Sequence, residues 1–385
     1  MQIGRSWATI KQEPLTRAKQ RLAEQAAFFI SVPPSVLIHE LFHALAIWLF
    51  GGQVVEFAYR VFWGYVVPAG DFTPVQNWFI ALAGPLGSLL FGVGIWLALR
   101  HNASRTLRYF GLRSFRFQVY FSLLYYPLIS LVLPIGDWRI IYAFGETPWL
   151  SAVTIVLHVG LLLAFWRADR AGWFEMPAFE TAADQARFEQ LEQLAAAGDV
   201  PAQLQVIDTL RFGGAGHQAQ RQLDSFLTDH PESADGLLLK AMLSSGNSSR
   251  VDSKTADYAQ QALDRRLDGN RAAIAREMLA RHHMERGEWA EAETELTRAL
   301  ALGPSPQRRA QLLYWRSQTL RHLGRFDEAT RDITEAIALA HATGDAAAEA
   351  RYTQELEVIH KHGGMTTLPS PVDKPAADTL QLPGN

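Results

Sequence analysis

The stretch PPSVLIHELFHALAIWLFGG, residues 33–52, is apolar enough to lie in a membrane, yet two histidines and a glutamate stand at its centre. His39, Glu40 and His43 form an H-E-x-x-H pattern. Residues four apart share one face of a helix, so both imidazoles can reach the same ion. Glu40 lies beside them and can act as general base on a water molecule. The pattern therefore predicts a metal site inside a membrane helix.

The cost of charge in a membrane favours this interpretation over a structural polar cluster. Each ionisable side chain near the bilayer centre costs about 2.5 kcal/mol or more unless it has a partner. A bound cation would be a partner for all three. The chain has no cysteine, so a transition metal must be held by histidine and carboxylate ligands. We expect Zn²⁺.

Two histidines leave a catalytic zinc site incomplete, because such sites usually have three protein ligands. Asp137 is the best candidate for the third. It follows a long apolar run in LVLPIGDWRII, after Pro134 and Gly136, which can end a helix. Glu146 and Asp71 are weaker candidates because both fall in predicted loops. The alternative role for Asp137 is a helix cap at the membrane interface.

Four apolar runs are long enough to cross about 30 Å of hydrocarbon, at residues 27–50, 77–99, 117–136 and 149–166. Basic residues concentrate before the first run, between the second and third, and after the fourth. The other two loops hold only Arg60 and Arg139. By the positive-inside rule, both termini and the 100–116 loop are cytoplasmic. The sequence thus predicts a multi-pass membrane protein in contact with the lipid bilayer.

Two further segments of the apolar half have structural signatures. Residues 53–67, QVVEFAYRVFWGYVV, are β-branched and aromatic, and Gly64 is a candidate turn or bulge, so we expect a β-hairpin. Its free edges must be covered or must bind an extended segment. In ALAGPLGSLLFGVG, residues 81–94, the small residues permit close helix approach and Pro85 favours a kink. We expect this helix to wall the metal cavity.

These features in this order resemble the site-2 protease family of intramembrane zinc metalloproteases: H-E-L-F-H-A in a span, G-G-x-V-x-x-F and a hairpin, A-L-A-G-P-L-G, and an aspartate after a later span. The resemblance covers about residues 30–145 and is to the compact bacterial branch called peptidase-M50B-like. It implies His39, His43 and Asp137 as zinc ligands, Glu40 as general base, and pairing of the hairpin with an extended substrate. The chain departs from the family around Leu86–Ser88, where an Asn is common.

The second half of the chain repeats itself. GEWAEAETELTRALALGP (287–304) aligns with GRFDEATRDITEAIALAH (324–341), and residues 214–231 share the spacing of small residues. A degenerate unit covers about 234–268. The pattern resembles tetratricopeptide repeats, which stack helix pairs into a solenoid with a concave surface. We expect that surface to bind a protein partner or substrate; the alternative is that the repeats only pack together or dimerise.

The predicted architecture is mainly all-α: a four-span helical membrane domain with a short β-hairpin, followed by an α-solenoid. The expected segments are a cytoplasmic arm (1–25), a membrane metalloprotease domain (26–170), a linker or first helix (171–200), a repeat domain (201–360) and a disordered tail (361–385).

The sequence predicts a zinc metalloendopeptidase that cleaves a membrane protein substrate, with cytoplasmic repeats that recruit or gate substrates, in the inner membrane of a bacterium. The alternative is a non-catalytic membrane scaffold that uses its repeats for assembly. The net charge of −3 gives no basic field, so no nucleic-acid partner is expected.

Overall fold

The computed structural model describes residues 14–133, 135–245 and 250–363, which form two compact units that divide after Gln222. Parts of two predicted segments, the basic arm and the C-terminal tail, lie outside the described residues, as does Pro134. The predicted boundaries at residue 170, between membrane domain and linker, and at residue 200, between linker and repeats, remain predictions. Each unit is described by itself.

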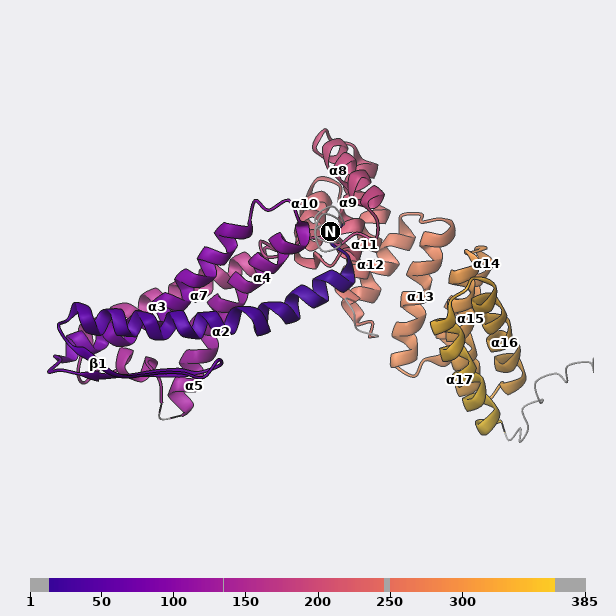
Figure 1. Cartoon of the computed structure of the whole chain (residues 1–385). Coiled ribbons are helices and arrows are strands. Elements are labelled where there is room, and N and C mark those ends of the chain that lie inside the picture. The colour runs from indigo at the N-terminus through magenta and orange to yellow at the C-terminus, as the bar shows by residue number, and fades with distance from the viewer. Residues whose placement is uncertain (1–13, 134, 246–249, 364–385) are drawn as a thin grey trace, which may run out of the picture. The chain divides into compact units, whose positions relative to one another are not determined.

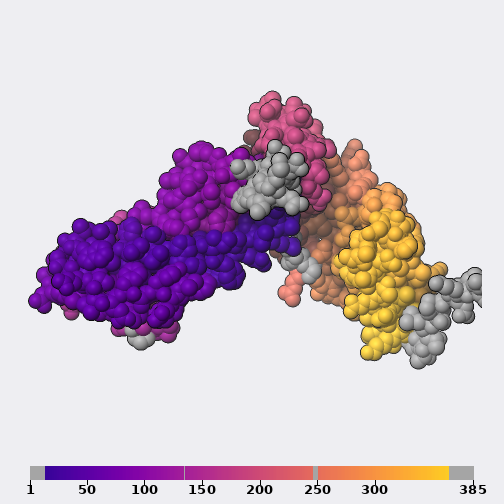
Figure 2. Space-filling view, viewed as in Figure 1, coloured from indigo at the N-terminus to yellow at the C-terminus, as the bar shows by residue number. Residues whose placement is uncertain are grey.

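The first unit is organised by a long helix, α2 (Arg17–Leu49), which the Thr16 side chain caps at its start. It contains residues 27–49 of the predicted first span and extends back into the polar arm as far as Arg17. The adjacent helix α3 (Pro74–Leu99) begins with a capping box formed by Thr73 and Gln76. In Figure 1, α2 and α3 lie side by side, and they pack closely together. Figure 2 shows α2, in indigo, exposed along one face of the unit.

Three helices of the described chain are long and apolar enough to cross a membrane: α2, α3 and α7 (Pro148–Arg170). The predicted count of four such spans is therefore wrong. Residues 117–132 of the predicted third run belong instead to a composite rod of α4 (Arg105–Tyr120), a π-helical turn η1 (Phe121–Tyr125) and α5 (Tyr126–Val132). Its first part is rich in arginine. Pro127 lacks the backbone N–H that would continue regular helical bonding there.

Contacts at one end of this unit bring three segments of the chain together. Phe179 N donates to Leu15 O over 2.8 Å, so the starts of α2 and of the segment after α7 are adjacent. Arg113 pairs with Glu24 over 3.0 Å, and Arg116 pairs with Asp169 over 2.6 Å. These contacts tie the start of α2, the helix α4 and the end of α7 together at this end of the unit.

The predicted hairpin is present as β1 (Gln53–Tyr59) and β2 (Gly64–Ala69), paired antiparallel with a bulge between Val54 and Glu56. Gly64 begins β2 opposite Tyr59, so it follows the turn directly. The hairpin packs along α2, and the Tyr59 hydroxyl donates to the carbonyl of Pro33 over 3.2 Å. Its turn therefore lies over the middle of α2, near the histidines.

Short helices complete the first unit. They are α6 (Trp138–Ile141), α8 (Ala182–Ala196), α9 (Val200–Phe212) and the first half of α10 (Gly216–Asp229). The α8 helix lies within the predicted linker and begins with a capping box between Thr181 and Asp184. Phe188 of this helix packs on Phe179, so the segment is tied to the rest of the unit.

The second unit is an array of antiparallel helices: α11 (Ala234–Ser245), α12 (Ser253–Asp264), α13 (Gly269–Glu285), α14 (Trp289–Ala301), α15 (Pro306–His322), α16 (Phe326–Ala342) and α17 (Ala346–His362). The aligned repeat residues Ala292, Leu296 and Ala299 are fully buried, as are their counterparts Ala329, Ile333 and Ala336. The predicted helical solenoid is confirmed, with the small residues where helices touch.

Candidate metal centre

Three predicted ligands from distant parts of the chain converge at one point in the first unit. His39 Nε2 lies 3.0 Å from Asp137 Oδ2, and His43 Nε2 lies 3.3 Å from the same oxygen. One ligand atom from each residue lies within 4.8 Å of the others. The two histidines are one helical turn apart on α2, and Asp137 directly precedes α6. The arrangement forms three sides of a small cation site.

The other ring nitrogens of both histidines are already engaged. His43 Nδ1 donates to the carbonyl of Ile80 on α3 over 2.7 Å, and this bond requires a proton on Nδ1. His39 Nδ1 lies 3.1 Å from Ser88 Oγ, also on α3. The neutral His43 ring therefore keeps a lone pair on Nε2 directed at the cluster, and the His39 ring does so when its Nδ1 donates to the Ser88 hydroxyl. Such outer partners fix the tautomer of metal-binding histidines and orient their rings.

Gly84 of α3 provides the space beside these two lone pairs. A Cβ atom built on Gly84 would lie 2.3 Å from His43 Nε2 and 2.5 Å from His39 Nε2, too close for any side chain. The prediction that α3 walls the cavity fits this placement. Two imidazole lone pairs and a carboxylate that face one small space repel each other unless a cation lies between them, so the residues fit a divalent metal.

Asp137 is held by Tyr126 of α5. The Tyr126 hydroxyl donates to Asp137 Oδ2 over 2.9 Å and accepts from Asp137 N over 3.2 Å. Gly136 adopts a positive φ of 94°, and a Cβ there would lie 2.5 Å from Ser130 Oγ, so glycine is required for this turn. Asp137 occupies the cap position of α6 without a capping hydrogen bond from its side chain. Its carboxylate is turned toward the histidines instead.

The weaker candidates for third ligand lie elsewhere. Asp71 is exposed in the loop after β2, and Glu146 is exposed beside a separate cavity that Arg139 also lines. Neither belongs to the cluster around His39.

Glu40 lies next to the cluster and is nearly buried, with 5% of its surface exposed. Within the described part of the chain its carboxylate makes no hydrogen bond or ion pair. The hairpin covers it: a Cβ on Gly64 would lie 2.7 Å from Glu40 Cγ and 3.0 Å from Oε1. Glycine at the start of β2 therefore lets the hairpin close over the carboxylate.

Sequence reasoning did not single out three polar residues that support the centre. Ser88 and Tyr126 contact predicted ligands, as described above. His158 lies within α7, where its Nε2 donates over 2.5 Å to the carbonyl of Leu123, which Pro127 cannot bond. Its Nδ1 accepts from the Tyr142 hydroxyl, and its ring stacks on Trp138, the neighbour of Asp137. The sequence signal that could have identified these residues is a side chain able to form hydrogen bonds within an otherwise apolar run.

Comparison with known protein families gives matches in both the first half of the chain and the repeats. Residues 34–207 match the family described as Peptidase M50B-like, and residues 256–305 and 277–340 match the tetratricopeptide repeat. Searches of curated proteins and of solved structures find no match. The resemblance drawn from H-E-x-x-H, A-G-P and the repeats is confirmed. Residues 34–207 of this chain are thus similar to the Peptidase M50B-like family, and matches to the tetratricopeptide repeat follow them.

Proposed function

We propose that the protein is a membrane-embedded zinc endopeptidase whose repeats recruit or gate its substrates. One observation supports this most: His39, His43 and Asp137 converge beside Glu40, a nearly buried carboxylate with no partner among the described residues. A site built only for stability would pair such a carboxylate, because an unpartnered buried charge is costly. Matching to a peptidase family supports the same reaction class.

Each residue has a distinct role in the proposed hydrolysis. His39, His43 and Asp137 would hold Zn²⁺, which when bound supplies Lewis acidity to the scissile carbonyl. Glu40 takes a proton from the attacking water and passes it to the leaving amide nitrogen. The Ile80 carbonyl holds His43 in the tautomer that leaves Nε2 unprotonated, and the Ser88 hydroxyl accepts from Nδ1 in the corresponding tautomer of His39. Tyr126 holds the Asp137 carboxylate in place.

The surroundings of the centre suggest the substrate class. The sheet has two strands, and both outer edges carry backbone groups without sheet partners among the described residues. An extended segment of a membrane protein can add to such an edge, and this would present its backbone near Glu40. The repeats would bind the substrate or a partner protein by their helical surface. We place them in the cytoplasm of a bacterial cell, on the basis of the basic loops.

Zinc content and peptide cleavage test this function together. We expect one zinc per chain in the purified wild type and none in a His39→Ala, His43→Ala double variant. Glu40→Gln should retain zinc but lose cleavage of a membrane-protein substrate by about 10²–10⁴-fold, because the amide cannot accept the proton. Full cleavage by Glu40→Gln contradicts the mechanism, and bound zinc without any turnover in the wild type supports a scaffold instead.

A reporter fused after residue 170 tests the topology. We expect it to report a cytoplasmic location, since Arg167 and Arg170 follow the last span. An extracytoplasmic signal contradicts the proposed orientation.

A further inference from the structure

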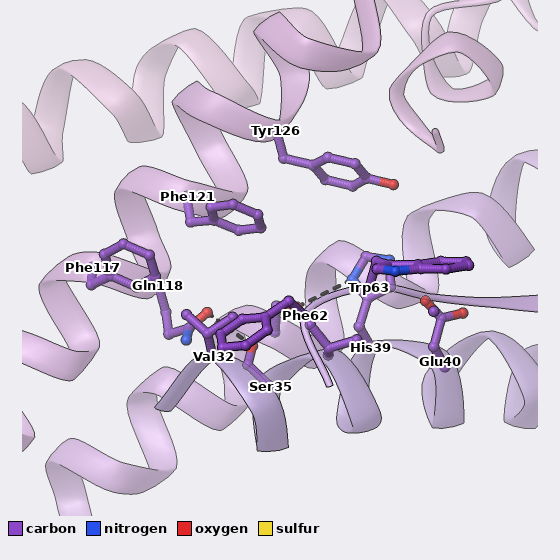
Figure 3. Close-up of a pocket in the computed structure, with 13 residues that line it drawn as sticks. Val32, Ser35, His39, Glu40, Phe62, Trp63, Phe117, Gln118, Phe121 and Tyr126 are labelled. Atoms are coloured by element: carbon purple, nitrogen blue, oxygen red, sulfur yellow. Dashed lines mark hydrogen bonds between the residues drawn. The ribbon is translucent and has the colours of Figure 1, made fainter. Parts of the chain in front are cut away.

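A cavity of about 150 Å³ opens directly beside Glu40. Its walls come from α2, the hairpin turn, the α4–η1 junction and α5. Figure 3 shows Phe121 and Tyr126 on the opposite side of this cavity from Val32 and Ser35 of α2. The apolar side chains that line it are Val32, Val36, Phe62, Trp63, Phe117 and Phe121. The cavity therefore joins the reacting groups to an apolar chamber.

The hydroxyl, amide and imidazole groups that line the cavity are already hydrogen-bonded, unlike the carboxylate of Glu40. Ser35 Oγ donates to Gln118 Oε1 over 2.9 Å, and Gln118 is only 1% exposed. Ser88 Oγ is engaged with His39. Among the residues that the structure describes, no Lys or Arg lines the cavity. The chamber thus offers little to a charged or strongly polar group, whereas an apolar group would be removed from water there.

The hairpin turn forms one side of the chamber and is conformationally strained. Val61 has a φ of +66°, which is unfavourable for a β-branched residue. Phe62 N donates to the carbonyl of Arg60 over 2.7 Å, which closes a tight three-residue turn around Val61. This turn places Phe62 and Trp63 at the cavity, where both remain about half exposed. Strain of this kind is typical of functional sites.

We propose that this chamber is the specificity subsite for one large apolar side chain of the substrate, Leu or Phe, next to the scissile bond. This inference rests on the proposed endopeptidase function. A cavity of similar volume with apolar walls accommodates a benzene ring. Val36 of α2 and Phe117 of α4 both line it with apolar side chains. Neither side chain takes part in the hydrogen bonds that hold the proposed metal ligands.

Two variants of opposite effect test the subsite. Val36→Phe fills the chamber and Phe117→Ala enlarges it, while Val159→Phe on the exposed face of α7 is the matched control. The probe is a Lys-flanked, alanine-rich membrane peptide of about 20 residues. It has a single central guest residue, Ala, Leu, Phe or Trp, between glycines. Both cleavage and binding of the peptides are measured. Binding is measured with the Val36, Phe117 and Val159 substitutions each combined with Glu40→Gln, and zinc content verifies that each variant is folded.

The wild type and the control should favour Leu and Phe over Ala by at least about 10-fold, in cleavage and in binding. Val36→Phe should reverse the preference toward Ala, and Phe117→Ala should extend it to Trp. Cleavage without discrimination among guests, or the same preference in all zinc-loaded variants, overturns the subsite but leaves the endopeptidase function intact. Guest-dependent binding without any cleavage by the wild type supports the subsite and contradicts the endopeptidase.

Discussion

Buried carboxylates are treated differently in the two halves of this protein. In the repeats, Glu277, Asp332 and Glu355 are nearly buried, and each has an arginine partner. Arg308 bonds to Glu277 over 2.6 Å, and Gln311 and the Trp315 ring nitrogen complete its shell. Arg316 bonds to Asp332 over 2.6 Å and Arg321 bonds to Glu355 over 2.8 Å. These acids are neutralised within the chain and serve to fix helix packing.

At the metal centre, in contrast, no arginine or lysine of the described chain contacts Asp137 or Glu40. Asp137 faces two imidazole nitrogens, and Glu40 faces the underside of the hairpin. The nearby basic residues of α4 are paired with other acids, such as Glu24 and Asp169. The comparison teaches that a buried acid paired with an arginine of the same chain serves packing, whereas the proposed ligands converge without such a partner, as expected of residues that bind a cation.

The strongest test of this contrast removes the proposed third ligand. Asp137→Ala should abolish cleavage and lower zinc affinity by more than the ~10–100-fold that loss of an outer partner causes. Glu146→Ala and Asp71→Ala are controls of the same charge change, and both should bind zinc like the wild type. Zinc titration by competition with a chelator measures all three. Normal affinity in Asp137→Ala, with loss in either control, moves the assignment to that residue.

Gly84 allows a test that changes no ligand and no charge. The added methyl group of Gly84→Ala must displace both Nε2 atoms, and a shift of about 1 Å at a reacting site can cost about 100-fold in rate. We expect a loss of this size in cleavage, with weaker zinc binding. Gly94→Ala is the matched control on the same helix, because its Cβ would meet nothing within 4 Å. Equal behaviour of the two variants contradicts the placement of Gly84.

The hydrogen bonds behind the ligands should have intermediate effects. Ser88→Ala removes the partner of His39 Nδ1, and Tyr126→Phe removes the hydroxyl that holds Asp137. Each should weaken zinc binding about 10–100-fold. Ser88→Thr keeps a hydroxyl and should restore part of the affinity. If Ser88→Ala and Tyr126→Phe bind zinc as tightly as the wild type, these bonds do not position the ligands.

A change in the repeats should have the smallest effect on the centre. Glu277→Gln leaves Arg308 without its carboxylate, and we expect a loss of about 1–3 kcal/mol in the stability of the α13–α15 contact. Hydrogen exchange of α13 and α15 in the whole protein measures this loss. Zinc content should not change, since the metal ligands all lie in the first unit. Loss of zinc in this variant contradicts the independence of the two parts.

The sequence predicted most local features of the site and missed those that depend on several helices. The H-E-x-x-H spacing places both histidines on one face of α2 whatever surrounds it. The apolar run at 117–136 was misread as a span like the others, because hydropathy does not register the π-helical turn at 121–125 or the missing donor of Pro127. His158 satisfies the carbonyl that results, a role that no pattern within α7 reveals.

By itself the sequence determined the elements whose signals are periodic and local: the long apolar helices, the hairpin at 53–69, the repeats and the pair of imidazoles on α2. Only the tertiary structure decided which acid joins them, because Asp137 lies 94 residues beyond His43 and reaches it through the Gly136 turn and the Tyr126 hydroxyl. It also decided that Gly84 leaves room for a cation and that Gly64 lets the hairpin cover Glu40. Close approach between distant segments depends on packing in three dimensions, and no spacing along the chain encodes it.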